Sequence, residues 1–258
     1  MLRFKSLGSG SSGNATVVQA RSTTQITHLL VDCGLGIRQL DVRLGQAGML
    51  AEQIDAIFIT HEHADHIGCA RQLALRHRIP VWMSHGTYSA MGEPDFEGLL
   101  RIAGDSVDIE IGPLAVRPFT VPHDAREPLQ LTCSDGASRL GVLTDLGHAT
   151  SHVIEMLAGC GTLLLECNHD PGMLAASTYP PFLKRRVSGA WGHLANDAAA
   201  AIAQAIVPHG LKQVVAAHLS EQNNRPELAR QALAAAIGCA EADIHVADGP
   251  SGCSWLTA

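Results

Sequence analysis

A short stretch of this 258-residue chain concentrates residue types that bind metal ions. His61, His63, Asp65 and His66 follow the apolar run 57–59, which is rich in β-branched and aromatic residues and predicts a buried strand. Neutral imidazole and carboxylate groups are ligands for zinc, manganese or iron. A strand that ends in three His and one Asp therefore predicts a metal site.

The spacing of these residues indicates two neighbouring metal ions rather than one closed site. His61 and His63 are two positions apart, so on an extended segment both side chains point to the same side. Asp65 and His66 come at a turn into a helix, where they can aim at a second point close by. In the alternative interpretation Asp65 only caps that helix. We prefer metal binding, because a cap leaves the three histidines without a role.

Composition limits the architecture and the location. The chain is 46% hydrophobic, which is enough for one large core, and we predict a single domain over residues 1–258. No apolar run approaches the ~20 residues of a membrane helix. The start of the chain lacks a signal-peptide hydrophobic region, and its seven Cys include no C-x-x-C pair. We therefore expect free thiols, no membrane association and a cytoplasmic location.

Strands and helices are interspersed along the whole chain. Apolar patterns predict strands at 2–7, 15–20, 27–31, 55–60, 80–83, 106–111, 114–121, 129–133, 139–144, 162–166, 214–217, 244–247 and 254–256. They predict helices at 36–47, 67–77, 151–158, 172–176, 196–206 and 226–237, with a turn and a short helix at 179–186. The simplest architecture is an α/β sandwich of two packed sheets with helices on both outer faces.

Four other predicted strands stop at a lone acidic or imidazole side chain. These side chains are Asp32, His123, Asp145 and His218. Each residue alone is weak evidence for a metal ligand, because a His after a strand is more often an ordinary surface residue. Together with the first stretch they gain weight, because a single pocket can use all of them.

The order of these residues resembles that of the metallo-β-lactamase-fold hydrolases, in which an H-x-H-x-D-H run precedes a His, a bridging Asp and a last His. The resemblance implies an αββα four-layer sandwich with a metal site between the sheet edges. It also implies a set of ligands: His61, His63 and His123 for one metal, Asp65, His66 and His218 for a second, and Asp145 between them. Asp32 matches an early Asp that supports the His run by orienting an imidazole.

Stretches 6–14, 165–170, 192–196 and 218–224 narrow the resemblance to the bacterial YycJ/WalJ branch, whose members are regarded as DNA exonucleases or related phosphodiesterases. Two positions depart from the branch pattern. Ala195 stands where Ser is usual after His-Leu, and Cys167 where a Ser is common. Neither change removes a metal ligand, but Ala195 cannot offer a hydroxyl to substrate.

His193 precedes the predicted helix 196–206, where backbone N–H groups favour anions. It is either a residue that binds phosphate or donates a proton, or a helix-start residue beside an Asn196 cap. The candidate catalytic residues are Asp65 and His193. Candidate substrate contacts are Lys184, Arg185 and Asn196. The net charge of −7 argues weakly against a broad nucleic-acid surface, although metal ions and the basic cluster 184–186 supply positive charge.

We expect a hydrolase that uses two divalent ions, zinc or manganese with iron as a third option, and cleaves DNA phosphodiesters through a metal-bound hydroxide. A thioesterase or lactonase of the same fold is the first alternative, and the acidic charge fits it slightly better. An iron-dependent oxidoreductase is the second, although such proteins commonly carry an acidic residue where His63 stands. A non-catalytic scaffold is the third, and it predicts broken ligands. The sequence indicates no protein partner and no oligomeric state.

Overall fold

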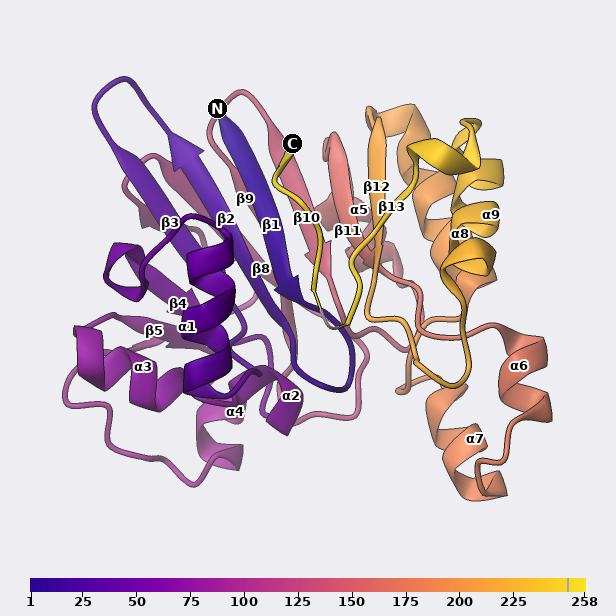
Figure 1. Cartoon of the computed structure of the whole chain (residues 1–258), viewed down its shortest axis with the longest axis horizontal. Coiled ribbons are helices and arrows are strands. Elements are labelled where there is room, and N and C mark those ends of the chain that lie inside the picture. The colour runs from indigo at the N-terminus through magenta and orange to yellow at the C-terminus, as the bar shows by residue number, and fades with distance from the viewer. Residues whose placement is uncertain (250) are drawn as a thin grey trace.

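Two seven-stranded sheets pack face to face in the computed structural model, which describes residues 1–249 and 251–258 (Figure 1). In spatial order, the first sheet contains β14 (Leu256–Thr257), β1 (Leu2–Gly8), β2 (Ala15–Arg21), β3 (Ile26–Val31), β4 (Ala56–Phe58), β5 (Val81–Met83) and β6 (Leu100–Ile102). The second contains β13 (His245–Val246), β12 (Gln213–Ala217), β11 (Thr162–Glu166), β10 (Arg139–Leu143), β9 (Leu129–Ser134), β8 (Leu114–Thr120) and β7 (Ile109–Ile111).

The helices lie outside the sheets or at one end of them. They are α1 (Ile37–Gln46), α2 (Ala64–Ile67), α3 (Ala70–His77), α4 (His85–Ala90), α5 (Ser151–Leu157), α6 (Pro171–Ala176), α7 (Pro181–Val187), α8 (Asn196–Ile206) and α9 (Pro226–Ile237), with short 3₁₀ turns at Ala51–Gln53, Val207–His209 and Glu241–Asp243. Figure 1 shows α1 and α3 on one flank and α8 and α9 on the other. Every helix in the described part of the chain is too short or too polar to span a membrane.

Buried apolar side chains separate the layers. Phe4 and Phe58 of the first sheet and Leu131 of the second belong to the cluster between the sheets. A second cluster joins the outer face of the first sheet to α1 and α3, and a third joins the outer face of the second sheet to α5, α8 and α9. Burial of both faces of each sheet explains why the strands are mostly continuous apolar runs. The prediction of an αββα four-layer sandwich is confirmed.

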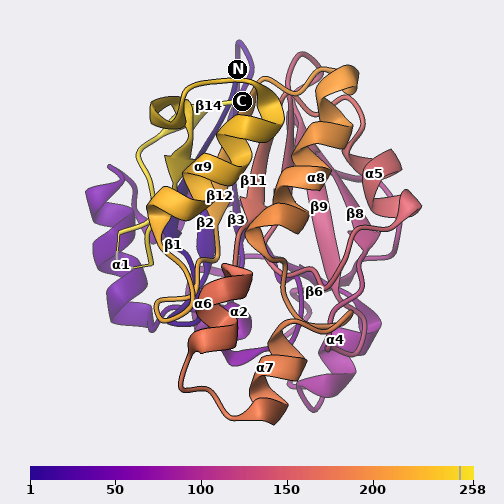
Figure 2. The same cartoon turned by 90° about the vertical axis from the view of Figure 1, so that its right-hand side faces the viewer.

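Parallel strands end at a common edge of the sandwich. In the first sheet β3 pairs in parallel with β4, and β4 with β5. In the second sheet β10 pairs in parallel with β11, and β11 with β12. The carboxyl ends of parallel strands meet at the same edge of a sheet. Figure 2 shows α2, α4, α6 and α7 at this end of the molecule.

The structure corrects some predicted elements. The single helix expected at 67–77 is interrupted at Gly68, whose φ of +27° and close approach to the backbone at residues 33 and 34 end α2. The expected strand 106–111 is shorter, because only Ile109–Ile111 pairs with β8. Helix α4 and strand β6 were not predicted. Their short sequences lack an apolar period, and their position comes from packing at the edge of the first sheet.

Candidate metal centre

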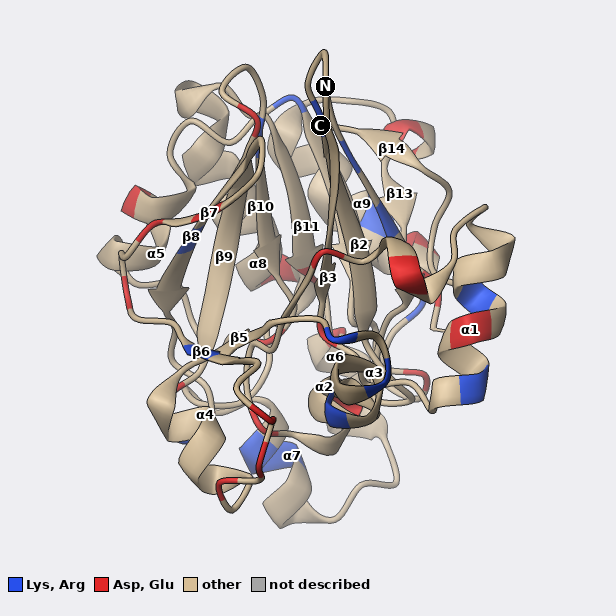
Figure 3. Ribbon diagram, turned by 90° about the vertical axis from the view of Figure 1, so that its left-hand side faces the viewer, with Lys and Arg blue, Asp and Glu red and all other residues tan. Residues whose placement is uncertain are grey.

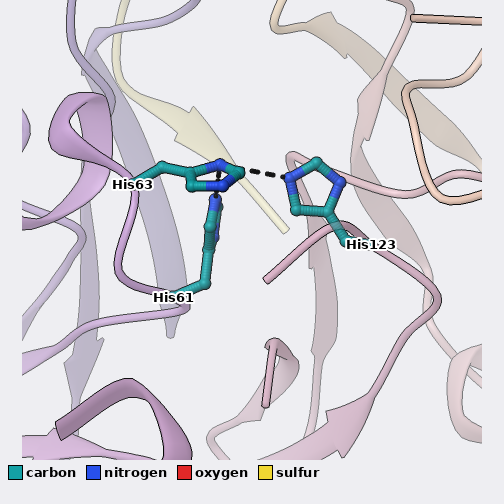
Figure 4. A group of neighbouring side chains, drawn as sticks. All are labelled: His61, His63 and His123. Carbon is teal, nitrogen blue, oxygen red and sulfur yellow. Dashed lines mark hydrogen bonds between the residues drawn. The ribbon is translucent and has the colours of Figure 1, made fainter. Parts of the chain in front are cut away.

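Three imidazoles from two sheets converge at the common edge (Figure 4). His61 and His63 follow β4, and His123 follows β8. His63 Nδ1 lies 3.0 Å from His61 Nε2 and 3.4 Å from His123 Nε2. The other ring nitrogens are engaged, since His63 Nε2–H donates to the Asp124 carbonyl at 3.2 Å and His123 Nδ1–H donates to the Gly192 carbonyl at 3.0 Å. These bonds leave one nitrogen lone pair on each ring aimed at one point.

A second group lies beside the first and contains a carboxylate between two imidazoles. Asp65 and His66 belong to α2, and His218 follows β12. Asp65 Oδ2 is 3.6 Å from His66 Nε2 and 3.6 Å from His218 Nε2. The potential ligand atoms of these three residues all lie within 4.8 Å of one another, as do those of the three-imidazole group.

Asp145, which follows β10, contacts both groups. Its Oδ2 lies 3.0 Å from His66 Nε2, and its Oδ1 lies 3.8 Å from His123 Nε2 and 3.2 Å from His218 Nδ1. The side chain is almost fully buried. Asp145 therefore lies between the two groups, with Oδ2 beside His66 and Oδ1 beside imidazoles of both groups.

Asp32 orients the His66 ring through the nitrogen that is not directed at the other candidate ligands. Asp32 Oδ2 accepts a hydrogen bond from His66 Nδ1 at 2.8 Å, and Asp32 Oδ1 accepts one from the Thr60 backbone N–H at 2.9 Å. Asp32 has a φ of +59° and His218 a φ of +53°, a conformation that is costly for residues other than Gly. Backbone strain at two of these positions is typical of functional sites.

Glu166, the last residue of β11, was not among the residues assigned a role from the sequence. It is fully buried, and its Oε1 lies 2.7 Å from His193 Nδ1 and 3.3 Å from His218 Nδ1. His193 Nδ1 also lies 3.1 Å from Asp145 Oδ1. Since β11 is paired with β10 and β12, Glu166 must end beside Asp145 and His218. The sequence contained one signal, an apolar strand ending in a carboxylate.

The loop 9–14 between β1 and β2 also contacts the centre. Ser9 Oγ accepts a hydrogen bond from the His218 backbone N–H at 2.7 Å. Asn14 donates its backbone N–H to the Asp65 carbonyl at 2.8 Å, and its side-chain amide nitrogen lies 3.0 Å from His66 Nε2. This Gly- and Ser-rich loop therefore fixes the positions of two candidate ligand segments.

Electrostatics divide the imidazoles into two kinds. Burial lowers the pKa of His61 and of His123, and neighbouring imidazoles add to the effect. Burial alone would also lower the pKa of His66 and of His218, but carboxylates outweigh it and raise both pKa values to about 10. Glu166 and Asp145 likewise outweigh burial at His193 and raise its pKa to about 11.

The residues present fit divalent metal ions. Asp145 Oδ2 and His218 Nε2 are buried and make no hydrogen bond within the described residues. Buried polar atoms are normally satisfied, so these two call for a ligand of another kind. A divalent cation satisfies both, and it offsets the negative charge that Asp65, Asp145 and Glu166 bring together.

The candidate substrate residues lie apart from this cluster. Lys184 and Arg185 are on α7, where Lys184 Nζ donates to the Ala175 carbonyl at 2.6 Å and Arg185 is exposed. Asn196 is buried, and its amide exchanges hydrogen bonds of 2.9 and 2.8 Å with the Asn224 amide. Burial and this pairing leave Asn196 unable to contact a substrate, so its prediction as a substrate contact is wrong. It is not a helix cap either, since Ala195 occupies the N-cap position of α8.

Comparison with known proteins places this site in a family. Residues 8–165 match the family model of the metallo-beta-lactamase superfamily. The chain belongs to the metallo-beta-lactamase superfamily. Exodeoxyribonuclease YycJ of Bacillus anthracis is 32% identical over 96% of both chains. Exodeoxyribonuclease WalJ of Streptococcus pneumoniae is 29% identical over 95% of this chain and 90% of its own. The predicted resemblance to this branch is confirmed, and the chain is a metal-dependent hydrolase.

Solved structures support the fold independently. The metallo-beta-lactamase fold protein YhfI from Bacillus subtilis superposes with a TM-score of 0.75 at 17% identity, covering 99% of both chains. A diphosphatase from the PhnP family superposes with a TM-score of 0.68 at 20% identity, covering 99% of this chain and 96% of its own. At these identities the likeness establishes the fold alone.

Proposed function

We propose that this member of the superfamily is a phosphodiesterase that degrades DNA in the cytoplasm. The proposal of DNA as the substrate rests on one observation. The chain is similar, over nearly its full length, to two relatives named exodeoxyribonucleases. The clustered imidazoles and carboxylates provide the matching chemistry, because a phosphodiester is cleaved by groups that stabilise charge on phosphoryl oxygens.

We further propose that two zinc or manganese ions occupy the centre, with these ligands: His61, His63 and His123 for one ion, Asp65, His66 and His218 for the other, and Asp145 for both. When bound, such a pair supplies Lewis acidity toward a phosphoryl oxygen and lowers the pKa of water. Asp32 and the Gly192 carbonyl keep the imidazoles in the orientation that ligation requires.

In this proposal His193 protonates the leaving oxygen. Its Nδ1 is engaged by Glu166, so Nε2–H is the proton that remains for the substrate. The carboxylates of Glu166 and Asp145 outweigh burial and raise the pKa of His193, which favours the protonated ring. The side chain of His193 is 23% exposed, whereas those of Glu166 and His218 are buried, so substrate can reach it. Asp65 acts only as a ligand in this scheme.

The direct test is degradation of labelled single-stranded and double-stranded DNA by the purified protein loaded with manganese. We expect release of short products, and we expect none from an Asp145→Ala variant purified in parallel, which controls for a contaminating nuclease. Metal-loaded protein that leaves both DNAs intact but hydrolyses a thioester or a lactone would contradict the proposal and favour the small-molecule alternative.

Metal content tests the proposed occupancy. Two zinc or manganese ions per chain, measured by elemental analysis of protein purified without added metal, agree with the proposal. Iron in their place would correct the identity of the metal, and a chain that retains no metal would contradict the two-metal centre.

A further inference from the structure

An open groove of about 670 Å³ lies beside the metal centre, on the side of His123 and His193. Its surface is mostly apolar, and it is lined by Trp191, Val121, Pro122, His148, His152 and Asp105, among others. Pro122 directly precedes His123, and Trp191 lies two residues before His193. Two residues span at most ~7 Å of chain. The groove therefore adjoins the segments that carry His123 and His193.

Trp191 is 62% exposed, whereas the other two Trp side chains of the sequence are partly buried. The exposed indole borders the groove instead of packing into the core. Indole offers a large flat face at little conformational cost, because only two side-chain torsions must be fixed.

The backbone that carries Trp191 is held on both sides. His148 Nδ1–H donates to the Ala190 carbonyl at 2.8 Å, and the His193 N–H donates to the Val187 carbonyl at 2.9 Å. Gly147 packs so closely on this segment that an added Cβ would lie 2.1 Å from the Ala190 carbonyl oxygen. The indole is therefore presented on a fixed support rather than on a mobile loop.

The charges around the groove indicate what it binds. Asp105 accepts hydrogen bonds from the Thr120 N–H at 2.8 Å and from His152 Nε2 at 3.0 Å, and its carboxylate disfavours a phosphate inside the groove. Cations lie instead on α7, which ends at Val187 and whose basic residues form the blue part of this helix in Figure 3. Arg185 of this helix is exposed, while Arg186 Nε pairs with Asp124 at 2.6 Å. Because Asp105 repels anions, an uncharged planar group suits the groove. The cations of α7 suit a polyanion that passes beside the groove.

We propose that Trp191 and this groove bind an unpaired base of the DNA strand by stacking, next to the phosphodiester that is cleaved. Alternating aromatic and cationic contacts are how proteins hold single strands without reading their sequence. The inference rests on the proposed DNA hydrolysis and adds a preference for unpaired ends, because a base inside a duplex is already stacked on its neighbours.

The test uses a phosphorothioate-linked oligothymidylate, which resists cleavage. Its binding to the metal-loaded protein is measured by fluorescence anisotropy. Trp191→Ala should weaken binding by about 5- to 150-fold, the range found when a base-stacking aromatic is replaced by alanine. Trp191→Phe should keep most of the affinity, since a phenyl ring still stacks. In the wild type, the oligonucleotide should also quench indole fluorescence, and Trp191→Phe should abolish that quenching.

Val42 provides a control, because it is 59% exposed on α1 and does not line the groove. Val42→Ala should bind the oligonucleotide like the wild type. The Trp191→Ala loss should be smaller for a blunt duplex than for the single strand.

Three results would overturn the inference: unchanged binding by Trp191→Ala, equal loss in Trp191→Phe and Trp191→Ala, or a wild-type dimer that Trp191→Ala converts to monomer in light scattering. The last would make the groove a contact between copies of this chain. The binding assay needs no cleavage, so it decides about the groove even if the wild-type protein digests no DNA and the proposed function fails.

Discussion

The two halves of the candidate metal centre surround their imidazoles with different groups. The imidazole half consists of His61, His63 and His123. Their hydrogen-bond partners are other imidazoles, two backbone carbonyls and a hydroxyl, and the partly exposed Asp124 carboxylate lies 3.5 Å from His123 Nε2. The carboxylate half consists of Asp65, His66 and His218, with Asp32 and Glu166 in contact with its imidazoles. The run from His61 to His66 thus contributes ligands to two sites of different charge.

This difference shows what each half must do before it can bind a metal. Imidazole binds metals only when neutral. Burial already favours the neutral form of His61 and His123, whereas His66 and His218, with pKa values of about 10, are protonated at neutral pH in the metal-free protein. The first half is ready to bind, and the second exchanges protons for metal.

The largest effect should come from the residue that joins the halves. Asp145→Ala removes the carboxylate that touches both, so we expect phosphodiester hydrolysis to fall by about a thousandfold or more. Elemental analysis of the variant should show fewer than two ions per chain, since both halves lose the ligand that they share. A variant that keeps two ions and full activity would mean that the halves work independently.

His193 should show an effect that depends on the leaving group. His193→Ala should lower the rate on DNA by about 10²- to 10³-fold, because an alkoxide leaving group needs a proton. A p-nitrophenyl phosphodiester, whose leaving group needs none, should be much less affected. Steady-state rates on the two substrates check this. Equal loss on both would indicate that His193 supports metal binding in the carboxylate half rather than proton transfer.

Asp32 should affect the halves unequally. Asp32→Asn weakens the acceptor that orients His66 Nδ1, and loss of such a partner typically lowers metal affinity by about 10- to 100-fold. We expect the loss in the carboxylate half, measured by competition with a chromophoric chelator. Asp55→Asn is the control, because Asp55 accepts the His28 backbone N–H on the same sheet, outside the metal centre. Equal weakening of both ions would contradict the division into halves.

The smallest effect is a difference in pH dependence. A protonated ligand must lose its proton to bind metal, so affinity in the carboxylate half should rise roughly tenfold per pH unit for each proton displaced, up to a pH near the pKa of about 10. His61 and His123 have pKa values below 6.5, so above that pH neither displaces a proton. Chelator competition between pH 7 and 9 measures both slopes; identical slopes would remove the electrostatic distinction.

Local patterns in the sequence were sufficient for the fold and for most of the metal cluster. The run from His61 to His66 places its residues by spacing, whereas the family resemblance implies the other three ligands. The structure brings all seven candidate ligands together. The αββα layers follow from continuous apolar strands alternating with helices. These features depend on neighbours along the chain, and such neighbours are visible in a sequence.

Glu166 and Asn196 show where local patterns stop. Glu166 reaches Asp145 and His218 only because β11 lies between β10 and β12. The order of strands in a sheet cannot be read from the sequence. Asn196 was predicted to contact the substrate, but its side-chain amide is buried and pairs with the Asn224 amide. In both cases the partner lies tens of residues away, so only the packed fold reveals the contact.

The positions of the candidate ligands along the chain have a consequence for folding. They extend from residue 61 in the first sheet to residue 218 in the second, so bound metal ties together segments that are distant in sequence. Metal that binds only the folded form shifts the folding equilibrium toward that form by mass action. The centre therefore serves as a reversible cross-link, and chelation should lower the unfolding temperature as well as the activity.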